Sequence, residues 1–347
     1  MSIPSPRFTL SKKVVIEQYR QAAELADVVS YSSKTNPKVT LILEEQTEAL
    51  FSVHMPNELK HIRDKSRVVF LAQGWNEARI AELYGQGIRH FVVDNEFDLD
   101  ILLSALENKA WKITLSLRLK LKENSIRTER YFVFGMSSEI INRRISELKG
   151  HPALEKLGVH FHRKTQNVSE WKLRRDIEAV LSPETLEAID LLNIGGGLPA
   201  RYANSNADVL EGIFMRITEF REWLHGQGIE LMVEPGRFIA APAGKLITHV
   251  MGVYDNNILV NASVYNSDMD AILVPAKLLV ENELEDRTGK PYVIKGCTPC
   301  SMDLFRYRVY LEKEPKIGDR ITFLNAGAYN FASDFCDLEV IPTEIIE

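Results

Sequence analysis

Eight short runs of apolar, mostly β-branched residues alternate with longer helical patterns between residues 28 and 236 of this 347-residue chain. This alternation is typical of βα units, in which a helix joins each strand to the next parallel strand. Because eight such strands close a barrel, we expect a (β/α)8 fold of the α/β class. The expected strands lie at residues 28–33, 51–55, 67–72, 90–94, 111–119, 157–162, 190–194 and 229–234.

The segments between these strands carry helix start and stop signals. Asn76-Glu77 and Ser169-Glu170 are expected to begin helices, and the glycine pairs at 85–87 and 226–228 to end them. One helix shows a continuous apolar face that would pack against the outside of the barrel. This face comprises Leu210, Ile213, Phe214, Ile217, Phe220 and Leu224.

After Pro242 the pattern changes to short strands with alternating apolar and polar residues, separated by turns such as Asp255-Asn256-Asn257. We therefore predict an antiparallel β domain, a sandwich or a barrel. The predicted barrel domain spans residues 16–240. The predicted β domain comprises residues 1–15 and 241–347, so that the amino-terminal segment adds a strand to it.

Charge and cysteine content exclude several classes of protein. The net charge is −6 and no basic run exceeds a pair, so we expect no nucleic-acid partner. The 3 cysteines are too few for a disulfide framework, which favours a reducing compartment. No uninterrupted run of ~18 apolar residues occurs, and the first ten residues lack a signal-peptide core. We expect a cytoplasmic protein with no membrane partner.

Barrel enzymes carry their reactive groups where strands end. Lys34 follows the first strand, and a lysine buried at a barrel mouth is a competent amine nucleophile for a Schiff base. Taken alone, a surface lysine at a strand end is the commoner occurrence. His160 and His162 share one face of the sixth strand. They would either pack as rings or bind a metal, and we expect no metal because no third ligand is visible.

The last two strands end in further polar clusters. Gly195, Gly196 and Gly197 would let backbone N–H groups approach a phosphate, or they would form an ordinary loop. The loops after strands seven and eight of such barrels commonly hold a phosphate. Glu234 and Arg237 end the eighth run and could form either a structural ion pair or part of that site.

The predicted β domain carries a Cys-x-x-Cys sequence at Cys297 and Cys300. A structural zinc site needs four ligands of this type, and only Cys336 remains. A free cysteine that acts as an acid or as a packing group is therefore favoured over a zinc or redox site.

In this order, the clusters resemble motifs of the ornithine/diaminopimelate/arginine decarboxylase family, whose members have the alanine-racemase fold (fold-type III) and use pyridoxal 5′-phosphate. Residues 31–37 look like Y-x-x-K-x-N-P, and residues 158–166 like G-x-H-F-H-x-G-S-Q. Residues 193–197 look like N-x-G-G-G, residues 234–237 are EPGR unchanged, and residues 327–329 match GAY. The resemblance spans nearly the whole chain.

The resemblance implies that Lys34 forms the Schiff base with the cofactor and later returns a proton, and that His162 stacks on the cofactor ring. It implies that Glu234 pairs with the pyridine nitrogen, which favours decarboxylation over racemisation. It also implies a homodimer with shared active sites, in which Cys300 reaches the partner's cofactor. The implied cofactor-binding residues are Lys34, His162, Thr165, Gly195, Gly196, Gly197, Glu234, Gly236, Arg237 and Tyr329, and the implied substrate-binding residues are Tyr265, Asp268, Cys300, Ser301 and Asp303.

The chain departs from the family pattern where substrate is chosen. Lys164-Thr165 replaces the Gly-Ser of the histidine motif, and we expect Thr165 to keep the hydroxyl contact to phosphate. Ser52 stands at the aspartate of Asp-x-Ala-Ser-x-x-Glu, followed by His54, Met55 and Glu58. Either Cys297 or Cys300 could be the family's acidic cysteine. We prefer Cys300, with Ser301 in place of the acid that meets a distal amine.

The resemblance therefore implies decarboxylation of a basic or diamino acid, or a conjugate of one, in polyamine or lysine-type metabolism. Val274 stands where diaminopimelate decarboxylases carry an arginine, which argues against diaminopimelate, and the missing acid argues against ornithine. Two alternatives remain at this point. One is a racemase or epimerase with the same fold and cofactor, and the other is a catalytically silent relative that binds without turnover.

Overall fold

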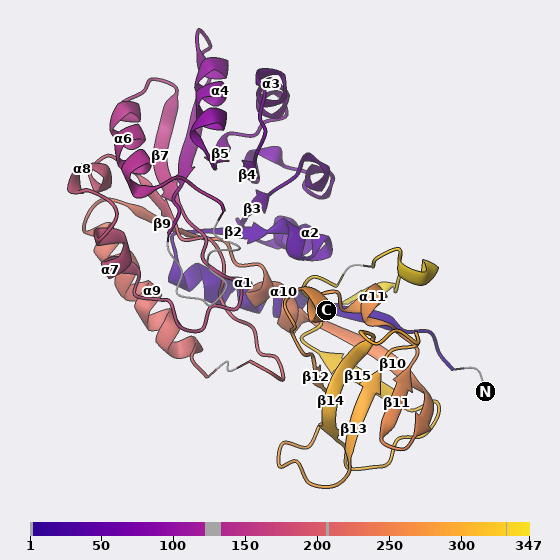
Figure 1. Cartoon of the computed structure of the whole chain (residues 1–347). Helices are drawn as coiled ribbons and strands as arrows, with labels where there is room; N and C mark the ends of the chain where they lie inside the picture. Colours follow the sequence, from indigo (N-terminus) through magenta and orange to yellow (C-terminus); the bar gives the residue numbers. More distant parts are fainter. Residues whose placement is uncertain (1–2, 122–132, 206–207, 331) are drawn as a thin grey trace. The chain divides into compact units, whose positions relative to one another are not determined.

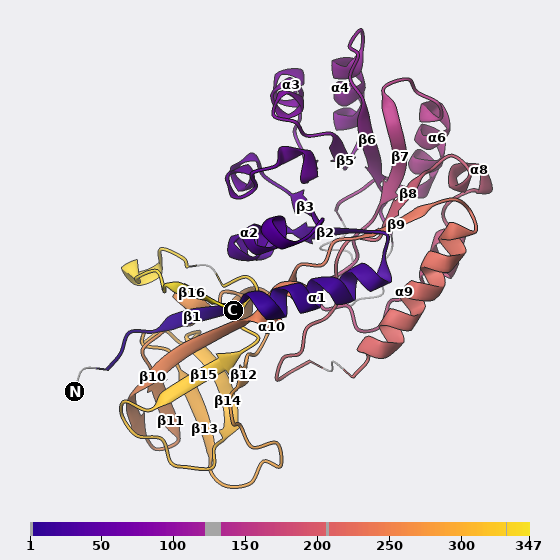
Figure 2. The ribbon, with the colours of Figure 1, turned by 180° about the vertical axis from the view of Figure 1, so that it is seen from behind.

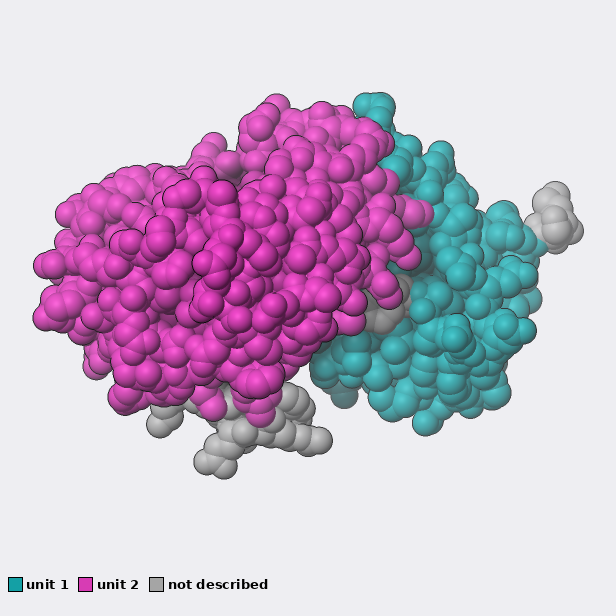
Figure 3. Space-filling view, turned by 90° about the horizontal axis from the view of Figure 1, so that it is seen from above, with its two compact units in different colours: residues 1–17, 200–207, 237–347 teal, residues 18–199, 208–236 magenta. Residues whose placement is uncertain are grey.

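The computed structural model describes residues 3–121, 133–205, 208–330 and 332–347. The chain divides into two compact units, coloured separately in Figure 3. The first, called the barrel unit here, comprises residues 18–199 and 208–236. The second, called the β unit, comprises residues 1–17, 200–207 and 237–347. Residues 200–207 group with the β unit because the Ala203 amide donates to the Lys277 carbonyl at 2.8 Å, and the Asn204 side chain to the Pro275 carbonyl at 2.8 Å.

Eight parallel strands close a barrel in chain order, which confirms the predicted (β/α)8 fold (Figure 1). Val69, Val92, Leu191 and Met232, from four different strands, pack together in one buried cluster. The barrel strands are β2 (Val28–Ser32), β3 (Leu50–Val53), β4 (Val68–Ala72), β5 (His90–Val93), β6 (Ile113–Arg118), β7 (Leu154–His160), β8 (Leu191–Asn193) and β9 (Glu230–Val233).

The helices between the strands follow most of the predicted signals. The Asn76 side chain caps α3 by accepting from the Arg79 amide at 2.9 Å. The apolar face of α9 is buried at Ile213, Ile217 and Phe220. None of the described helices is long and apolar enough to cross a membrane. The helices are α1 (Lys12–Leu25), α2 (Pro37–Gln46), α3 (Glu77–Gly85), α4 (Glu96–Leu106), α6 (Ser138–Leu148), α7 (Leu173–Glu178), α8 (Pro183–Leu186) and α9 (Leu210–His225), with short 3-10 turns η1 (Ser33–Thr35), η2 (Pro56–His61) and η3 (Lys65–Arg67).

One predicted helix start is wrong. The helix expected at Ser169-Glu170 begins instead at Leu173. The Asn167 side chain accepts from the backbone amides of Ser169 at 3.4 Å and Glu170 at 3.0 Å, which holds the segment in a turn. A side chain that bonds its own backbone two or three residues later competes with a helix in this way.

The β unit contains a mixed sheet. Strand β1 (Arg7–Ser11) pairs antiparallel with β10 (Gly244–Tyr254) and parallel with β16 (Thr343–Ile346), as Figure 2 shows. The amino-terminal segment thus adds a strand here, and the sheet is not antiparallel throughout, because β11 and β13 are also parallel. The other strands are β11 (Asn257–Val260), β12 (Leu279–Val280), β13 (Pro291–Lys295), β14 (Leu304–Tyr310) and β15 (Arg320–Leu324), and the short helices are α10 (Arg237–Ala243), α11 (Val264–Ser267), α12 (Asp270–Leu273) and η4 (Phe335–Asp337).

Candidate active site

Lys34 lies at the carboxyl end of β2, in the short turn η1. Asn36 is held in an extended conformation before Pro37, and its side chain caps α2 by accepting from the Lys38 amide at 3.0 Å. The strand therefore ends before Lys34 and the helix begins after it. Of the two alternatives left open, the exposed lysine is present: Lys34 is exposed, whereas Ser33 and Thr35 in the same turn are buried.

Glu234 follows β9 and is buried in the barrel unit's interior, with 7% of its surface exposed. Oε1 accepts from the Ser52 hydroxyl at 2.7 Å and from the Asn193 amide at 3.1 Å, and Oε2 lies 3.1 Å from His160 Nε2. Burial alone would raise the pKa of Glu234, but His160 and the hydrogen bonds outweigh it and hold that pKa well below its usual range. The barrel unit therefore contains a buried, fixed carboxylate anion.

His162 lies two residues after the end of β7, and its Nδ1 accepts from the Gly196 amide at 3.2 Å. A ring nitrogen that accepts carries no proton, so any proton of the neutral ring is on Nε2. Desolvation, and after it the electrostatic effects of Arg118 and His160, lower the pKa of His162 to about 4. The residue nevertheless keeps solvent-accessible surface. His162 is thus an uncharged ring crowded by the strand ends but open to a ligand.

The glycine loop after β8 is tightly packed. A Cβ on Gly195 would lie 2.6 Å from the Phe161 carbonyl oxygen, and a Cβ on Gly196 would lie 2.6 Å from that of Glu234. The Gly195 amide donates to Asn193 Oδ1 at 2.8 Å, and the Gly196 amide donates to His162. That the three glycine amides hold a phosphate stays a prediction; in this structure the Gly195 and Gly196 amides are bound within the chain.

Several buried polar atoms beside these residues have no hydrogen-bond partner within the part of the chain that the structure describes. They are Thr35 Oγ1, His54 Nδ1, Glu58 Oε2 and His160 Nδ1, and all belong to the carboxyl ends of β2, β3 and β7 or the turns that follow them. Buried polar atoms are rarely left unpaired. Together with an accessible amine, an uncharged ring and a buried anion, they suit a flat, polar, ionisable ligand such as a pyridine aldehyde.

In the β unit, Arg237 is paired within the chain. Its guanidinium makes a two-point ion pair with Asp270 and donates to the Tyr202 hydroxyl at 2.9 Å. Its guanidinium carbon also lies 4.9 Å from the centre of the Tyr329 ring. Sequence reasoning missed Asp270 and Tyr202, because neither lies in a motif. Of the alternatives left open for Arg237, the structural ion pair is present, but with Asp270 and not with Glu234.

The predicted substrate residues of the β unit are partly brought together. The phenol of Tyr265 lies close enough to Cys300, Asp303 and Cys336 for their charges to raise its pKa, after desolvation. Cys300 lies close enough to Cys336 to raise the pKa of that thiol, after desolvation, so the two thiols are neighbours. Sequence reasoning left Cys336 out, because 35 residues separate it from Cys300 and no motif marks it. Ser301 is exposed on the same loop.

Two of the predicted substrate residues, Asp303 and Asp268, are buried. Asp303 is 2% exposed and accepts from the Val264 amide at 2.9 Å and from the Thr298 hydroxyl at 2.7 Å, so it holds its own loop. Asp268 is 1% exposed, and neither of its carboxylate oxygens accepts a hydrogen bond of normal geometry from a described residue. Both side chains are enclosed by the β unit.

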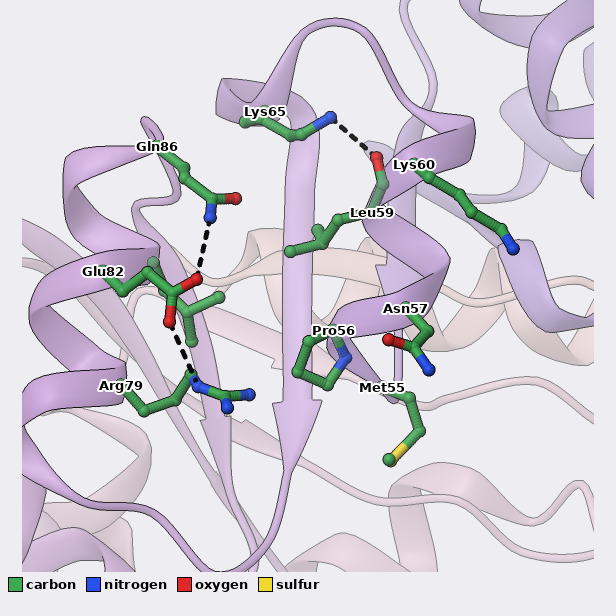
Figure 4. A pocket seen from close by; sticks show the side chains of 10 residues that line it. Met55, Pro56, Asn57, Leu59, Lys60, Lys65, Arg79, Glu82 and Gln86 are labelled. Carbon is green, nitrogen blue, oxygen red and sulfur yellow. Dashed lines mark hydrogen bonds and ion pairs between the residues drawn. The ribbon is translucent and has the colours of Figure 1, made fainter.

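Two further features lie outside these clusters. Thr165 is exposed, and its neighbour Lys164 makes an ion pair with Glu170 at 3.0 Å, which offsets its charge. A groove of about 580 Å³ lies between η2 and α3, where Lys65 donates to the Leu59 carbonyl and Arg79 pairs with Glu82 (Figure 4). Across the described ranges, no group of three or more His, Cys, Asp or Glu side chains is arranged to hold a metal ion.

Comparison with known proteins agrees with this geometry. Residues 12–241 match the family model described as pyridoxal-dependent decarboxylase, pyridoxal binding domain. The chain is 25% identical to the diaminopimelate decarboxylase of Pseudomonas aeruginosa, over 94% of this chain and 83% of that protein. Its fold matches the lysine/ornithine decarboxylase of Vibrio vulnificus complexed with cadaverine, with a TM-score of 0.80 and 23% identity over 99% of this chain and 95% of that one. It also matches the diaminopimelate decarboxylase of Helicobacter pylori complexed with L-lysine, with a TM-score of 0.81 and 20% identity over 99% and 92% of the two chains.

Proposed function

The chain belongs to the family of pyridoxal-dependent decarboxylases, and from that premise we propose that it removes the α-carboxylate of a basic or diamino acid, or of a conjugate of one. Its cofactor is pyridoxal 5′-phosphate. Relatives are named for diaminopimelate, lysine, ornithine and arginine decarboxylation, which supports a substrate of this chemical class. The observation that carries the proposal is the buried, hydrogen-bonded carboxylate of Glu234.

When bound, pyridoxal phosphate supplies a ring that withdraws the electron pair left on the α-carbon as CO2 departs. Glu234 would keep a proton on the pyridine nitrogen, because a buried anion favours a cation beside it. Lys34 would hold the cofactor's aldehyde through its amine, and its exposed position suits an amine that must also release it. His162 would lie against the ring as an uncharged face.

The phosphate would be held at the ends of the last two barrel strands. Gly197 and Gly236 would offer backbone amides, and Thr165 its exposed hydroxyl. The resemblance assigns Arg237 and Tyr329 to the same group. Since Arg237 already has a carboxylate partner, we expect it to act as a fixed hydrogen-bond donor more than as an uncompensated charge.

We propose that the working unit is a cytoplasmic homodimer with shared active sites. Cys300 would be the acid that one subunit offers to the other's substrate. Replacing Cys300 with Ser is expected to lower turnover at least about 100-fold, the usual worth of a positioned acid, whereas Cys336→Ser on the neighbouring thiol should have little effect. Light scattering should give twice the 39.5 kDa chain mass. A fully active Cys300→Ser enzyme or a fully active monomer would contradict this assignment.

The substrate is tested by CO2 release from purified, pyridoxal-phosphate-loaded protein. The panel comprises arginine, ornithine, lysine, meso-diaminopimelate, carboxynorspermidine and an acidic amino acid. We expect release from one basic or diamino member and none from the acidic control. Lys34→Ala should reduce the release to background, while Lys38→Ala, which removes an exposed lysine one turn away, should not. Loaded protein that releases CO2 from none of the basic substrates would refute the substrate class.

A further inference from the structure

Strand β3 places one hydroxyl directly on the buried carboxylate. We propose that Ser52 is a positioning residue for the cofactor: it fixes one oxygen of Glu234 and favours the charged carboxylate that a protonated pyridine nitrogen requires. The inference rests on the proposed function, since it concerns how the same site binds its cofactor. It assigns a role to Ser52, which stands where the family motif has an aspartate.

The hydrogen-bond directions around Ser52 are set by chemistry. Ser52 Oγ lies 2.7 Å from Glu234 Oε1 and 2.7 Å from Ser30 Oγ. An ionised carboxylate can only accept, so Ser52 gives its single proton to Glu234. Ser30 must then donate its own proton to Ser52. Two hydroxyls in series therefore point their protons toward one oxygen, and both serines are fully buried.

The position of Ser52 follows from the barrel register. Ser52 pairs with Ser32 across the parallel strands β2 and β3, and Ser30 lies two residues earlier on β2. Residues two apart on a strand share a face, so both hydroxyls project to the same side. A carboxylate at position 52, in this geometry, would place a second acid beside Glu234, and one of the two would then need a proton. A hydroxyl at this position adds no second acid beside Glu234.

Ser52 is one of three residues that hydrogen-bond Glu234, and this limits how much its replacement should weaken cofactor binding. Asn193 also donates to Oε1 at 3.1 Å, and His160 contacts Oε2 at 3.1 Å. Removing the Ser52 hydroxyl takes away the shortest of the three contacts and leaves the other two. We therefore expect weakened binding of the cofactor's ring nitrogen, not loss of the site.

The test compares two ligands that differ only at the ring nitrogen. Pyridoxal 5′-phosphate and its 1-deaza analogue, with CH in place of the nitrogen, are titrated into wild-type protein and Ser52→Ala by equilibrium dialysis. Losing a hydrogen bond to a charged group is expected to weaken pyridoxal phosphate binding about 10-fold. Binding of the deaza analogue should change less than about 2-fold, because it presents no proton to Glu234. Ser52→Thr, which keeps the hydroxyl, should restore the wild-type ratio.

Ser116→Ala is the matched control. Ser116 is also a fully buried barrel serine, but its hydroxyl lies 3.4 Å from His90 and not on Glu234. It should leave both affinities unchanged. If Ser52→Ala does not fold, Ser30→Ala carries the same test, with a weaker loss for pyridoxal phosphate alone.

Two results would overturn the inference: unchanged affinity of the serine variant for pyridoxal phosphate, or an equal loss for both ligands, which would indicate a general structural role. Both results differ from failure of the proposed function. In that case the wild-type protein itself would not bind pyridoxal phosphate.

Discussion

Replacing Asp268 with Asn is expected to stabilise the protein at pH 8 and to leave its stability at pH 4 nearly unchanged. Asp268 is 1% exposed, and neither oxygen accepts a hydrogen bond of normal geometry from the described residues. Burial, and after it the charge of Asp270, raises the pKa of Asp268 well above its usual range. The folded protein therefore prefers this carboxyl protonated, and its charged form is held at a cost.

The sign of the pH dependence follows from proton binding. In the unfolded chain an aspartate ionises near pH ~3.9, while in the folded protein Asp268 keeps its proton to higher pH. Asp268 therefore costs no stability below pH ~4, and its cost grows as the pH rises toward and above the raised pKa. At pH values above the raised pKa, each unit by which folding raises the pKa of Asp268 lowers the free energy of unfolding by about 1.4 kcal/mol. Asn resembles the protonated acid in shape and charge, so Asp268→Asn should recover at least about 1.4 kcal/mol at pH 8.

The assay is urea unfolding of wild type and variant at pH 4 and pH 8, at a fixed cofactor concentration. Asp270→Asn is the matched control. It removes a buried carboxylate two residues further along the chain, but that carboxylate is paired with Arg237. That variant should lose about 3–5 kcal/mol, since it leaves a buried guanidinium unpaired. Equal effects of Asp268→Asn at the two pH values, or destabilisation at pH 8, would refute the reasoning.

Two further predictions concern the barrel unit. Stability should fall as the pH drops from about 6.5 to 4, because desolvation lowers the pKa values of His54, His90 and His162 to about 3, 4 and 4, whereas the unfolded chain takes up their protons. With three protons taken up, the free energy of unfolding should fall by up to about 4 kcal/mol for each pH unit. Urea midpoints that do not change between pH 7 and 5 would contradict this prediction. Gly196→Ala should destabilise by about 2 kcal/mol in thermal unfolding, because the added Cβ meets the Glu234 carbonyl oxygen at 2.6 Å. Gly212→Ala in α9, where nothing lies within 4 Å, should stabilise by about 0.5–1 kcal/mol and so controls for the general effect of the substitution.

The barrel was predictable because its signals are local. Each strand is a short apolar run, and each βα connection is long enough for one helix, so the eight strands lie within a few residues of their expected bounds. The β unit was less predictable. Whether β1 pairs parallel or antiparallel with a strand more than 230 residues away is decided by the tertiary fold and not by its sequence.

For the site, the sequence predicted the residues themselves but not their hydrogen-bond partners. Motif spacing indicated Lys34, His162 and Glu234, and the structure places all three at carboxyl ends of neighbouring or nearby barrel strands. The sequence did not indicate that the Gly195 and Gly196 amides would bind Asn193 and His162, since hydrogen-bond partners are set by contacts distant in the chain. A backbone amide in a phosphate-binding motif can therefore already donate to another residue of the folded chain.

The buried carboxylates show most clearly that hydrogen-bond partners are set by the tertiary fold. Glu234, Asp268, Asp270 and Asp303 are all nearly enclosed, and residue type alone would make them equivalent. Their donors differ: Glu234 has three, Asp270 has a guanidinium, Asp303 has its own loop, and Asp268 has none of normal geometry among the described residues. In the proposed function, a carboxylate that holds a proton on a cofactor would have to be anionic before the cofactor binds, and the donors around Glu234 favour this while keeping the acid in the barrel. The donor that completes the set, Ser52, lies 182 residues away in the chain. The donors of this acid are therefore brought together by the closure of the barrel, which places Ser52 of β3 beside the carboxylate that follows β9.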